Sequence, residues 1–287
     1  MVIIQEMIKV AIQGVAGCFH DIAARKYFEG QKVETVPCET FQSLFETLKQ
    51  DPAMLGAVAI ENTIAGSLLQ NHNLLHESGL KIVGEQKLRI VQNLCALPGQ
   101  TIADIKEAAS HPIALAQCAA FLDANRHIKA VESDDTALSA KEIAEEGPKA
   151  KGKAAICSDL AADIYGLEVL AASIETNKRN YTRFLIVADS WIANDFTKGK
   201  NIDKSSLVFT LPHEEGSLAK VLSILSYYNM NLTKIQSLPI LGREWEYQFY
   251  IDLSFTNIIK YKQAIEAITP LTKDLLILGE YEDGLQR

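Results

Sequence analysis

The stretch Asn177-Lys-Arg-Asn-Tyr-Thr-Arg-Phe-Leu-Ile-Val187 joins a polar half to an apolar half. Its second half, residues 184–187, is the kind of apolar, β-branched run that fills a buried strand. Thr182 and Arg183 stand where the polar half meets that strand. A guanidinium offers a planar fork of donors to a carboxylate, and a hydroxyl can donate to an oxygen beside it. The pair therefore predicts either a site for an acidic small molecule or, more simply, a capping threonine beside a surface arginine.

The composition bounds the classes of protein to which this chain can belong. It has 287 residues, is 48% hydrophobic and 22% charged, and carries a formal net charge of −8. These values describe a globular protein of one large or two smaller domains, and the negative charge argues against a nucleic-acid surface. The five cysteines are widely spaced without a Cys-x-x-Cys pair, which favours reduced thiols and a cytoplasmic location. The apolar residues 1–9 lack the basic region and cleavage site of a signal peptide, so we expect neither secretion nor a membrane span.

Short apolar strands alternate with helical patterns up to residue 187, which is the α/β pattern. The strand expected at residues 9–13 runs into Gly14 and Gly17 before a helical pattern begins. A strand, a glycine turn and a helix N-terminus together present backbone N–H groups to an anion. The spacing of the two glycines is not that of a dinucleotide fingerprint, so the loop does not predict a nucleotide cofactor.

Polar side chains follow two further expected strands at their carboxyl ends. One buried strand ends in Glu61-Asn62-Thr63, and another closes at Ser110 and is followed by His111. Open α/β sheets bind ligands at such strand ends, although Asn62 or Thr63 equally suits the plainer role of a helix cap. Adjacent side chains on a strand point apart, and no Gly-x-Ser-x-Gly elbow is present, so Ser110 and His111 do not predict a hydrolase.

His72 and His76 are four residues apart on one expected helix and would share a face of it. No third ligand and no Glu-x-x-His spacing accompany them. We therefore interpret them as histidines on a helix surface and expect no metal site.

The C-terminal part has a different order of elements. Residues 189–204 lose apolar periodicity and gain Asp, Asn, Lys and Gly, which indicates a linker between domains at 1–188 and 205–287. Beyond it the strand and helix patterns follow in the order βαββαβ, which is the ferredoxin-like order. Apolar residues alternate without a break at 247–255, so one face of that strand is expected to be buried.

Five motifs follow one another along nearly the whole chain. They are Gly14-x-x-Gly17 with Ala23-Ala24, Ile60-Glu61-Asn62-Thr63-x-x-Gly66-Ser67, Ser110-His111-Pro112 with Ala114-Leu115-x-Gln117-Cys118, Tyr165-Gly166-Leu167, and Asn180-x-Thr182-Arg183-Phe184. In this order they resemble the motifs of bacterial, monofunctional prephenate dehydratases with a C-terminal ACT regulatory domain. Each motif is weak alone, but the ordered set is specific.

The resemblance implies a fold and a site. Residues 1–188 would form two α/β lobes like a type II periplasmic binding protein, with chain crossings near Leu80 and Ile174 and the site between the lobes. The family uses its Thr-Arg-Phe motif for catalysis, which assigns that role to Thr182, Arg183 and Phe184. The substrate-binding residues would be Glu61, Asn62, Thr63, Ser110, Gln117, Cys18, His20 and Asn180, of which Cys18 and His20 replace serines that are usual in the family's loop.

The implied reaction converts prephenate to phenylpyruvate with loss of carbon dioxide and water, and it needs no metal or organic cofactor. Thr182 would donate to the leaving hydroxyl, Arg183 would hold a substrate carboxylate, and the neutral donors would fix the orientation of the substrate. Two other classes stay open: a dehydratase that prefers arogenate, and a non-catalytic small-molecule sensor coupled to an ACT domain.

The ACT resemblance implies feedback regulation by phenylalanine and a homodimer or homotetramer formed through ACT domains. Gly216-Ser217-Leu218 resembles the family's Gly-Ala-Leu motif, whereas Gln236-Ser237-Leu238-Pro239 stands where the family has Glu-Ser-Arg-Pro and loses both charges. We still expect phenylalanine to bind, because backbone groups can hold much of an amino acid. The effector site would comprise Gly216, Ser217, Leu218, Gln236, Ser237 and Leu238.

Overall fold

The computed structural model describes residues 7–240, 242–243 and 246–284. The N-terminal stretch from which we inferred the absence of a signal peptide lies mostly outside these ranges. None of the helices in the described part has the length and apolar character that a membrane span requires.

The chain divides into two compact units, each built from separate stretches of sequence. The first unit comprises Met1–Leu68 and Gln86–Phe184, and the second comprises Leu69–Glu85 and Leu185–Arg287.

The first lobe of the first unit is a parallel sheet with two helices. Its elements are β1 (Ile8–Gln13), α1 (Phe19–Tyr27), β2 (Val33–Cys38), α2 (Phe41–Gln50), β3 (Leu55–Asn62) and the short β4 (Gly66–Ser67), which pairs with the end of β3. The strand order is β3-β1-β2, with parallel pairing throughout. The chain therefore steps from β1 to β2 in one direction and then to β3 in the other, so right-handed crossovers place α1 and α2 on opposite faces. The carboxyl ends of β1 and β3 form a switch point of the kind where open sheets bind ligands.

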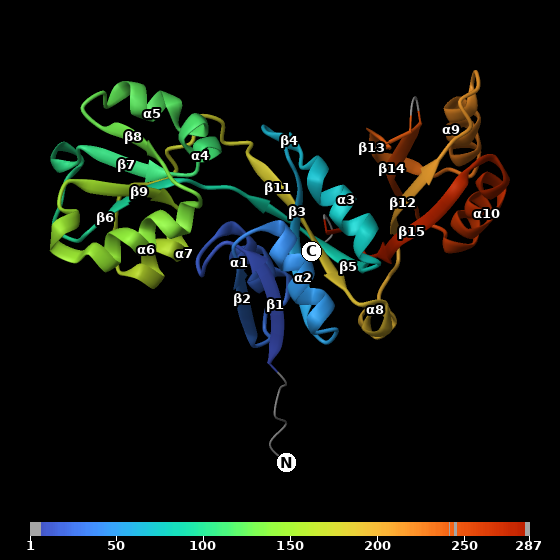
Figure 1. Cartoon of the computed structure of the whole chain (residues 1–287), viewed down its shortest axis with the longest axis horizontal. Coiled ribbons are helices and arrows are strands. Elements are labelled where there is room, and N and C mark those ends of the chain that lie inside the picture. Colours follow the sequence, from blue (N-terminus) through green and yellow to red (C-terminus); the bar gives the residue numbers. More distant parts are fainter. Residues whose placement is uncertain (1–6, 241, 244–245, 285–287) are drawn as a thin grey trace, which may run out of the picture. The chain divides into compact units, whose positions relative to one another are not determined.

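The second lobe repeats this arrangement in a five-stranded sheet. Its strands, in the order β10-β6-β9-β7-β8, are β10 (Glu168–Ala171), β6 (Asn93–Ala96), β9 (Lys153–Cys157), β7 (Glu107–Ser110) and β8 (Lys129–Glu132). β7 is parallel to both β8 and β9, so the carboxyl ends of β7 and β9 form a second switch point. Figure 1 shows α4 (Pro112–Gln117) and α5 (Ala119–Ala124) on one side of this sheet, and α6 (Thr136–Glu146) and α7 (Asp159–Tyr165) on the other. The two short helices α4 and α5 meet at Cys118.

The chain enters the second lobe later than the crossing expected near Leu80. β5 (Lys81–Arg89) comes first, and the five-stranded sheet begins only with β6 at Asn93. Local periodicity does not mark this crossing, since the apolar and polar alternation continues through residues 81–97. The return follows Ile174, whose side chain packs in the core of the second lobe and whose N–H donates to Gln92 O at 2.8 Å. A segment without regular structure then leads to β11 (Tyr181–Ala188).

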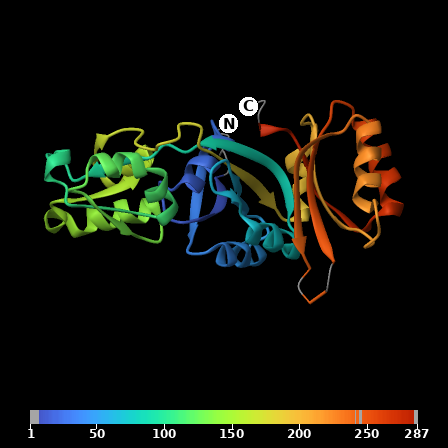
Figure 2. The ribbon, with the colours of Figure 1, turned by 90° about the horizontal axis from the view of Figure 1, so that it is seen from above.

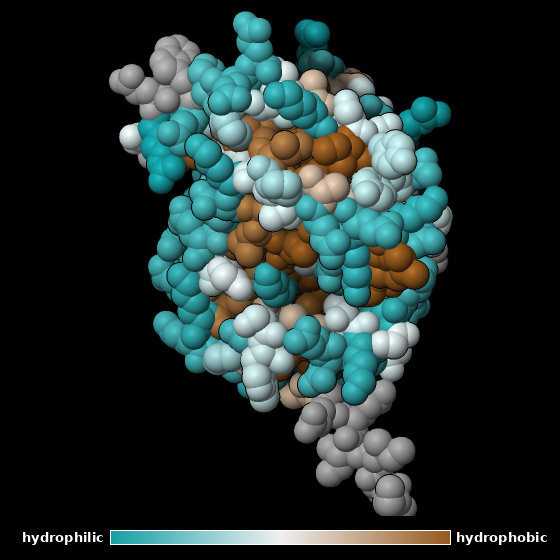
Figure 3. All heavy atoms as spheres, turned by 90° about the vertical axis from the view of Figure 1, so that its right-hand side faces the viewer, coloured by the Kyte–Doolittle hydropathy of each residue, from teal (hydrophilic) through white to brown (hydrophobic). Residues whose placement is uncertain are grey.

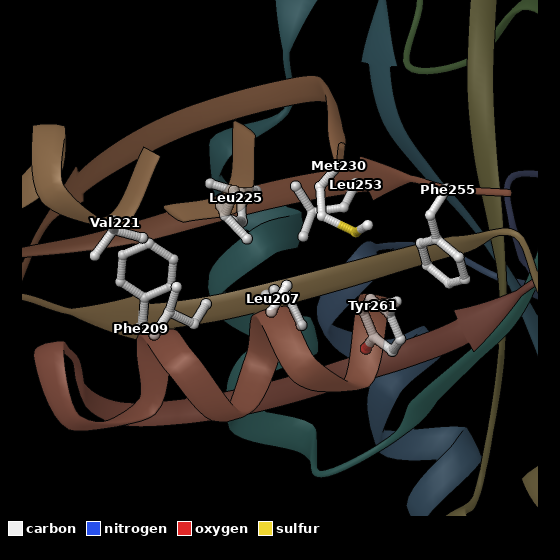
Figure 4. Packing of buried hydrophobic residues seen from close by; sticks show 11 residues of the cluster. Leu207, Phe209, Val221, Leu225, Met230, Leu253, Phe255 and Tyr261 are labelled. Atoms are coloured by element: carbon white, nitrogen blue, oxygen red, sulfur yellow. The ribbon is translucent and has the colours of Figure 1, made fainter. Parts of the chain in front are cut away.

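The βαββαβ order expected for the C-terminal part is confirmed in the second unit. Its elements are β12 (Lys204–Thr210), α9 (Ser217–Tyr227), β13 (Asn231–Pro239), β14 (Tyr247–Ser254), α10 (Ile258–Ile268) and β15 (Lys273–Tyr281). The strands form an antiparallel sheet in the order β13-β14-β12-β15, with α9 and α10 together on one face (Figure 2). Figure 4 shows the core between helices and sheet, where Leu207 and Phe209 of β12 meet Val221 and Leu225 of α9.

The alternation along β14 explains what covers the other face of this sheet. Ile251 and Leu253 belong to the core under the helices, so Tyr250 points to the opposite face. There it meets α3 (Leu69–Ser78), with the His72 ring centroid 5.2 Å from that of Tyr250. His76 Nε2 lies 3.2 Å from the Gln248 side-chain amide. His72 and His76 therefore pack against the sheet, which corrects our interpretation of them as surface residues: α3 has to cover a face that β14 leaves uncovered.

The segment expected as a linker contains regular structure. Residues 190–197 form α8 (Ser190–Thr197), which Asp189 caps by accepting from Trp191 N at 2.8 Å. Trp191 is 76% exposed, so the helix has only a narrow apolar stripe and little periodicity to reveal it. The expected linker ends at Lys204, which is already the first residue of β12.

Candidate active site

Asn62, at the carboxyl end of β3, is the centre of a hydrogen-bonded set. Its Nδ2 group donates to Asn180 Oδ1 at 2.8 Å and to Thr182 Oγ1 at 2.9 Å. Its Oδ1 accepts from the N–H groups of Ile64 and Ala65 at 2.9 and 2.8 Å. Both ends of the carboxamide are therefore fixed. The helix-cap role considered for Asn62 is replaced by a turn that its side chain closes onto Ile64 and Ala65.

Thr63 holds the beginning of β11 in place. Its N–H donates to Tyr181 O, and its hydroxyl accepts from Tyr181 N, each at 2.9 Å. The same hydroxyl donates to Arg179 O at 3.0 Å. Thr63 thus uses its polar groups on the backbone that precedes Thr182, which differs from the expected contact with substrate.

Asn180 extends the set to the second lobe. It is fully buried, and its Nδ2 donates to Gln117 Oε1 at 2.8 Å. Gln117 is the last residue of α4, so the contact joins the first lobe to the end of a helix that begins beyond Ser110. Residues from three distant parts of the sequence therefore meet in one chain of amide groups that ends at Thr182.

Thr182 is 9% exposed, and its hydroxyl oxygen accepts from Asn62. A threonine hydroxyl has one proton to donate in addition to its acceptor capacity. No acceptor for that proton is found among the hydrogen bonds of the described residues. The hydroxyl is therefore held by a donor from one side and can donate from the other.

Arg183 is 5% exposed, which excludes the surface arginine that the sequence left open. Its Nη1 lies 3.2 Å from Glu61 Oε1, in an ion pair whose carboxylate side chain is 34% exposed. The expected carboxylate partner of Arg183 is thus supplied here by the protein. Glu61 is thus the more exposed member of the pair, and Arg183 the buried one.

His20 and Phe184 belong to an apolar cluster between α1 and β3. Their ring centroids lie 4.9 Å apart in an edge-to-face arrangement, and Phe41 meets the other side of His20 at 5.5 Å. His20 Nε2 accepts from Ala59 N at 3.3 Å, and burial lowers the pKa of His20 to about 3. The imidazole is therefore neutral and internal, which differs from the expectation that His20 lines the site.

Cys18 and Ser110 also direct their polar atoms into the protein. Cys18 Sγ donates to Gln13 O at 3.4 Å, and burial, with the charge of Asp135 adding to it, raises the pKa of the thiol. Ser110 is fully buried and its Oγ donates to Ile156 O at 2.6 Å, which ties β7 to β9. Both residues therefore support the switch points instead of presenting donors to a ligand.

The glycine loop after β1 serves close approach between the lobes. A Cβ on Gly17 would lie 2.6 Å from the Cα of Ala161, and its φ of +84° favours glycine as well. Ser158 Oγ donates to Gly17 O at 2.6 Å. The Gly17 N–H, which we expected to face an anion, donates at 2.8 Å to the carboxylate of Asp21. The anion held at this turn is thus a side chain of the protein.

Two residues outside the sequence motifs, Glu175 and Arg89, brace the segment that carries Asn180. Their side chains form an ion pair at 3.1 Å. They are far apart in the sequence and belong to no recognisable motif, so no signal short of the fold brings them together.

The family of this chain follows from its similarity to known proteins. Residues 10–190 match the family described as prephenate dehydratase. The arogenate dehydratase/prephenate dehydratase 2 of Arabidopsis thaliana is 35% identical over 284 residues, covering 96% of this chain and 72% of that protein. The bifunctional chorismate mutase/prephenate dehydratase of Aquifex aeolicus is 33% identical over 284 residues, covering 98% and 75%.

Solved structures resemble the whole chain. The prephenate dehydratase of Arthrobacter aurescens in complex with L-Phe has a TM-score of 0.85 at 27% identity and covers 98% of this chain and 91% of that one. GqqA, described as a novel type of quorum quenching acylase, has a TM-score of 0.83 at 30% identity and covers 97% and 100%. From the matched family domain and these full-length likenesses, we conclude that this chain belongs to the prephenate dehydratase family.

Proposed function

We propose that the chain converts prephenate to phenylpyruvate. The observation that carries the proposal is the Thr182 hydroxyl, which Asn62 holds as an acceptor while its proton remains to be donated. The family assignment supports the choice of reaction, and the fixed amides of Asn62 and Asn180 support the choice of site.

The reaction breaks two bonds of the substrate and is balanced without an oxidant or reductant. The bond from the ring to its carboxylate breaks, carbon dioxide leaves, and the electron pair enters the ring. The bond from the ring to its hydroxyl oxygen breaks with that oxygen taking its electron pair and a proton, so that water leaves. Because hydroxide is a poor leaving group, a donor at this oxygen lowers the barrier, and such help is typically worth about 10²–10⁴-fold.

Thr182 is the residue that we assign to the leaving oxygen. A threonine hydroxyl is a weak acid, so it acts as a donor in a relay in which water restores the proton that it gives. Asn62 supports this role because its amide occupies the acceptor side of the hydroxyl and turns the proton away from itself. Neutral groups suit the surroundings of the departing carboxylate, since a cation beside it would stabilise the negative charge that has to move into the ring as carbon dioxide leaves.

Arg183 is assigned to the second carboxylate of the substrate, the one that remains in the product. We propose that this carboxylate takes the place of Glu61 at one edge of the guanidinium. The pairing is favourable because a guanidinium can hold a carboxylate through two parallel hydrogen bonds. Glu61 is the more exposed partner and would turn to solvent.

The test incubates the purified chain with prephenate and follows the absorbance of phenylpyruvate in alkali. Formation of product that requires Thr182 supports the proposal, and binding without product would identify a sensor instead. Parallel assays with arogenate decide the substrate by the ratio of kcat/KM, since names of the relatives contain both activities.

We propose that the βαββαβ part of the second unit is an ACT domain that binds phenylalanine and inhibits the reaction. The complex of the Arthrobacter relative with L-Phe supports the choice of effector. Gly216 precedes α9 with a φ of +76° and no side-chain cap, so the first N–H groups of this helix can receive a carboxylate. The segment Gln236–Leu238 lies on β13, where Leu238 is buried and Ser237 is exposed. Calorimetric titration of the full chain with phenylalanine tests this, and millimolar phenylalanine giving neither heat nor lost activity would overturn it.

A homodimer or homotetramer through this domain is also proposed. In the described part of the chain β13 pairs with β14 alone, so its outer edge has backbone groups to offer. Figure 3 shows several apolar patches between polar side chains on the side where α9 and α10 lie. Exposed apolar residues of these helices include Tyr227, Ile258 and Ile259. Light scattering of the full chain would measure the oligomer, and a monomer at micromolar concentration would contradict the proposal.

A further inference from the structure

The segment at 172–180, between β10 and β11, carries Asn180 into the site without forming a helix or strand. A segment of this kind needs other contacts if its last residue is to stay in place. Those contacts converge on Glu175, which sequence analysis did not single out and which the proposed reaction does not use.

Glu175 is a buried carboxylate with a partner for each oxygen. Its Oε1 accepts from Arg89 Nη2 at 3.1 Å and from Ser173 Oγ at 2.8 Å. Its Oε2 accepts from Gln92 N at 3.1 Å. The Lys178 ammonium lies 3.6 Å from Oε1. The side chain thus joins both ends of the segment to the end of β5 and the residues that follow it.

Arg89 and Ile90 complete the connection to the site. Arg89 Nε donates to Lys178 O at 3.1 Å, so one guanidinium bonds both Glu175 and the backbone two residues before Asn180. Ile90 N donates to Asn180 O at 2.8 Å. The backbone of Asn180 is therefore held by the same short stretch that Glu175 binds, while its side chain holds Asn62.

The charge on Glu175 is kept by these partners. Burial alone would raise its pKa, but the hydrogen bonds from Gln92 and Ser173, together with the Lys178 charge, lower the pKa below its usual value. The carboxylate is therefore ionised at neutral pH and pairs with a guanidinium that is itself partly exposed.

We infer that Glu175, acting through Arg89 and the Arg89–Gln92 stretch, is a positioning residue for the dehydration reaction. Glu175 keeps Asn180 in place, Asn180 fixes the side chain of Asn62, and Asn62 then donates its amide N–H to the Thr182 hydroxyl. Glu175 touches no reacting atom, and its effect on the rate passes through the orientation of the Thr182 hydroxyl. The inference rests on the proposed function for the identity of the reaction, but its structural part stands on the contacts alone.

The test compares Glu175→Gln with a matched control, Glu146→Gln. Glu146 also forms an ion pair, with Lys153 at 2.7 Å, but on the surface of the second lobe. Small misplacement of reacting groups costs up to about 10²-fold, so Glu175→Gln should lower kcat by about 10- to 10²-fold with KM changed much less. Glu146→Gln should leave both within about twofold of the original chain. If Glu175→Gln folds poorly, Arg89→Met tests the same contacts, because the Arg89 side chain is partly exposed and its replacement disturbs the interior less.

A double-mutant cycle separates positioning from general damage. In a Thr182→Ala background the hydroxyl that Glu175 orients is gone, so adding Glu175→Gln should lower kcat little further. Equal losses in both backgrounds would overturn the inference. Hydrogen exchange of the Ile90 amide gives a readout that needs no activity, and it should speed up at least about tenfold in Glu175→Gln but not in Glu146→Gln. An unchanged Ile90 exchange rate refutes the brace, whereas faster exchange in a chain inactive toward prephenate would refute only the proposed reaction.

Discussion

Asn62 Nδ2 lies 2.9 Å from Thr182 Oγ1, and the same nitrogen donates to Asn180 Oδ1 at 2.8 Å. The amide nitrogen thus donates to two side chains of the Asn-x-Thr-Arg-Phe stretch and, at 3.2 Å, to the backbone oxygen of Tyr181. Because the Asn62 oxygen is also bonded, the amide cannot turn over without losing five hydrogen bonds. The threonine therefore meets a fixed donor, and the direction of its own proton follows from that contact.

Removing the Thr182 hydroxyl should affect the rate more than binding. We expect Thr182→Ala to lower kcat by about 10²–10⁴-fold and to change KM by only a few-fold, because the leaving oxygen needs the donor mainly in the transition state. Thr182→Ser keeps the hydroxyl and should recover much of the rate. Steady-state kinetics with prephenate measure both variants. A Thr182→Ala variant within a few-fold of the original kcat would remove Thr182 as the donor.

Changing Glu61 tests whether it competes with substrate for Arg183. Glu61→Gln removes a carboxylate from the guanidinium but keeps the size of the side chain, so we expect a lower KM for prephenate. Arg183→Lys should raise KM, since an ammonium cannot reproduce a two-point carboxylate contact. The KM for prephenate should therefore fall in Glu61→Gln and rise in Arg183→Lys, as substrate titrations of the two variants would measure. If Glu61→Gln raises KM instead, Glu61 holds Arg183 in place and the substrate carboxylate binds elsewhere.

Burial of neutral His20 should make the free energy of unfolding depend on pH. Its folded pKa, at about 3, lies below the ordinary value near 6.5, so unfolding takes up a proton between these values. The contribution is fully present above about pH 6.5 and is lost as pH falls, by about 1.4 kcal/mol per pH unit. Denaturant titrations from pH 7 to pH 4 should show this slope in the original chain and a shallower one in His20→Met. Equal slopes would mean that His20 is accessible to protons in the fold.

In the second unit the Lys204 ammonium lies 2.7 Å from Glu85 Oε1, and both side chains are almost completely buried. Removing one partner leaves an uncompensated charge, so Lys204→Met should cost about 3–5 kcal/mol of unfolding free energy. The double variant Lys204→Met/Glu85→Gln should recover part of this loss because the buried Glu85 charge is removed too, whereas the Asp283 carboxylate, 3.8 Å from the Lys204 ammonium, keeps its charge. Urea titrations would measure the free energy of unfolding of the original chain, the single variant and the double variant. A loss below about 1 kcal/mol in Lys204→Met would show that water reaches the pair.

Phenylalanine should still bind despite the lost Glu and Arg of the effector motif. Each charge-assisted hydrogen bond that is lost costs about 1.5–3 kcal/mol, so we expect weaker affinity with the preference for phenylalanine retained. Restoring the charges with Gln236→Glu and Leu238→Arg tests this by calorimetry. Leu238 is buried, so Gln236→Glu alone is the safer variant, and it should tighten binding of the ammonium group. Unchanged affinity in Gln236→Glu would place the effector away from β13.

The amino-acid sequence alone predicted the alternation of strands and helices, the βαββαβ order of the C-terminal part and the positions of the polar strand ends. These features depend on local periodicity and on turn chemistry, which neighbouring residues carry. It also identified the stretch around Thr182, because the change from polar to apolar residues falls between adjacent positions.

Which polar side chains face one another depends on how the chain packs in three dimensions. Asn62 and Thr63 have similar sequence contexts, yet one holds the Thr182 side chain and the other the Tyr181 backbone. Ser110 ends β7 as Asn62 ends β3, but its hydroxyl binds a neighbouring carbonyl, and aromatic rings bury His20 at the start of α1. Glu175 finds Arg89 through contacts between segments far apart in the chain. Burial and long-range hydrogen bonding are set by packing across lobes, and no local pattern in a single sequence records them.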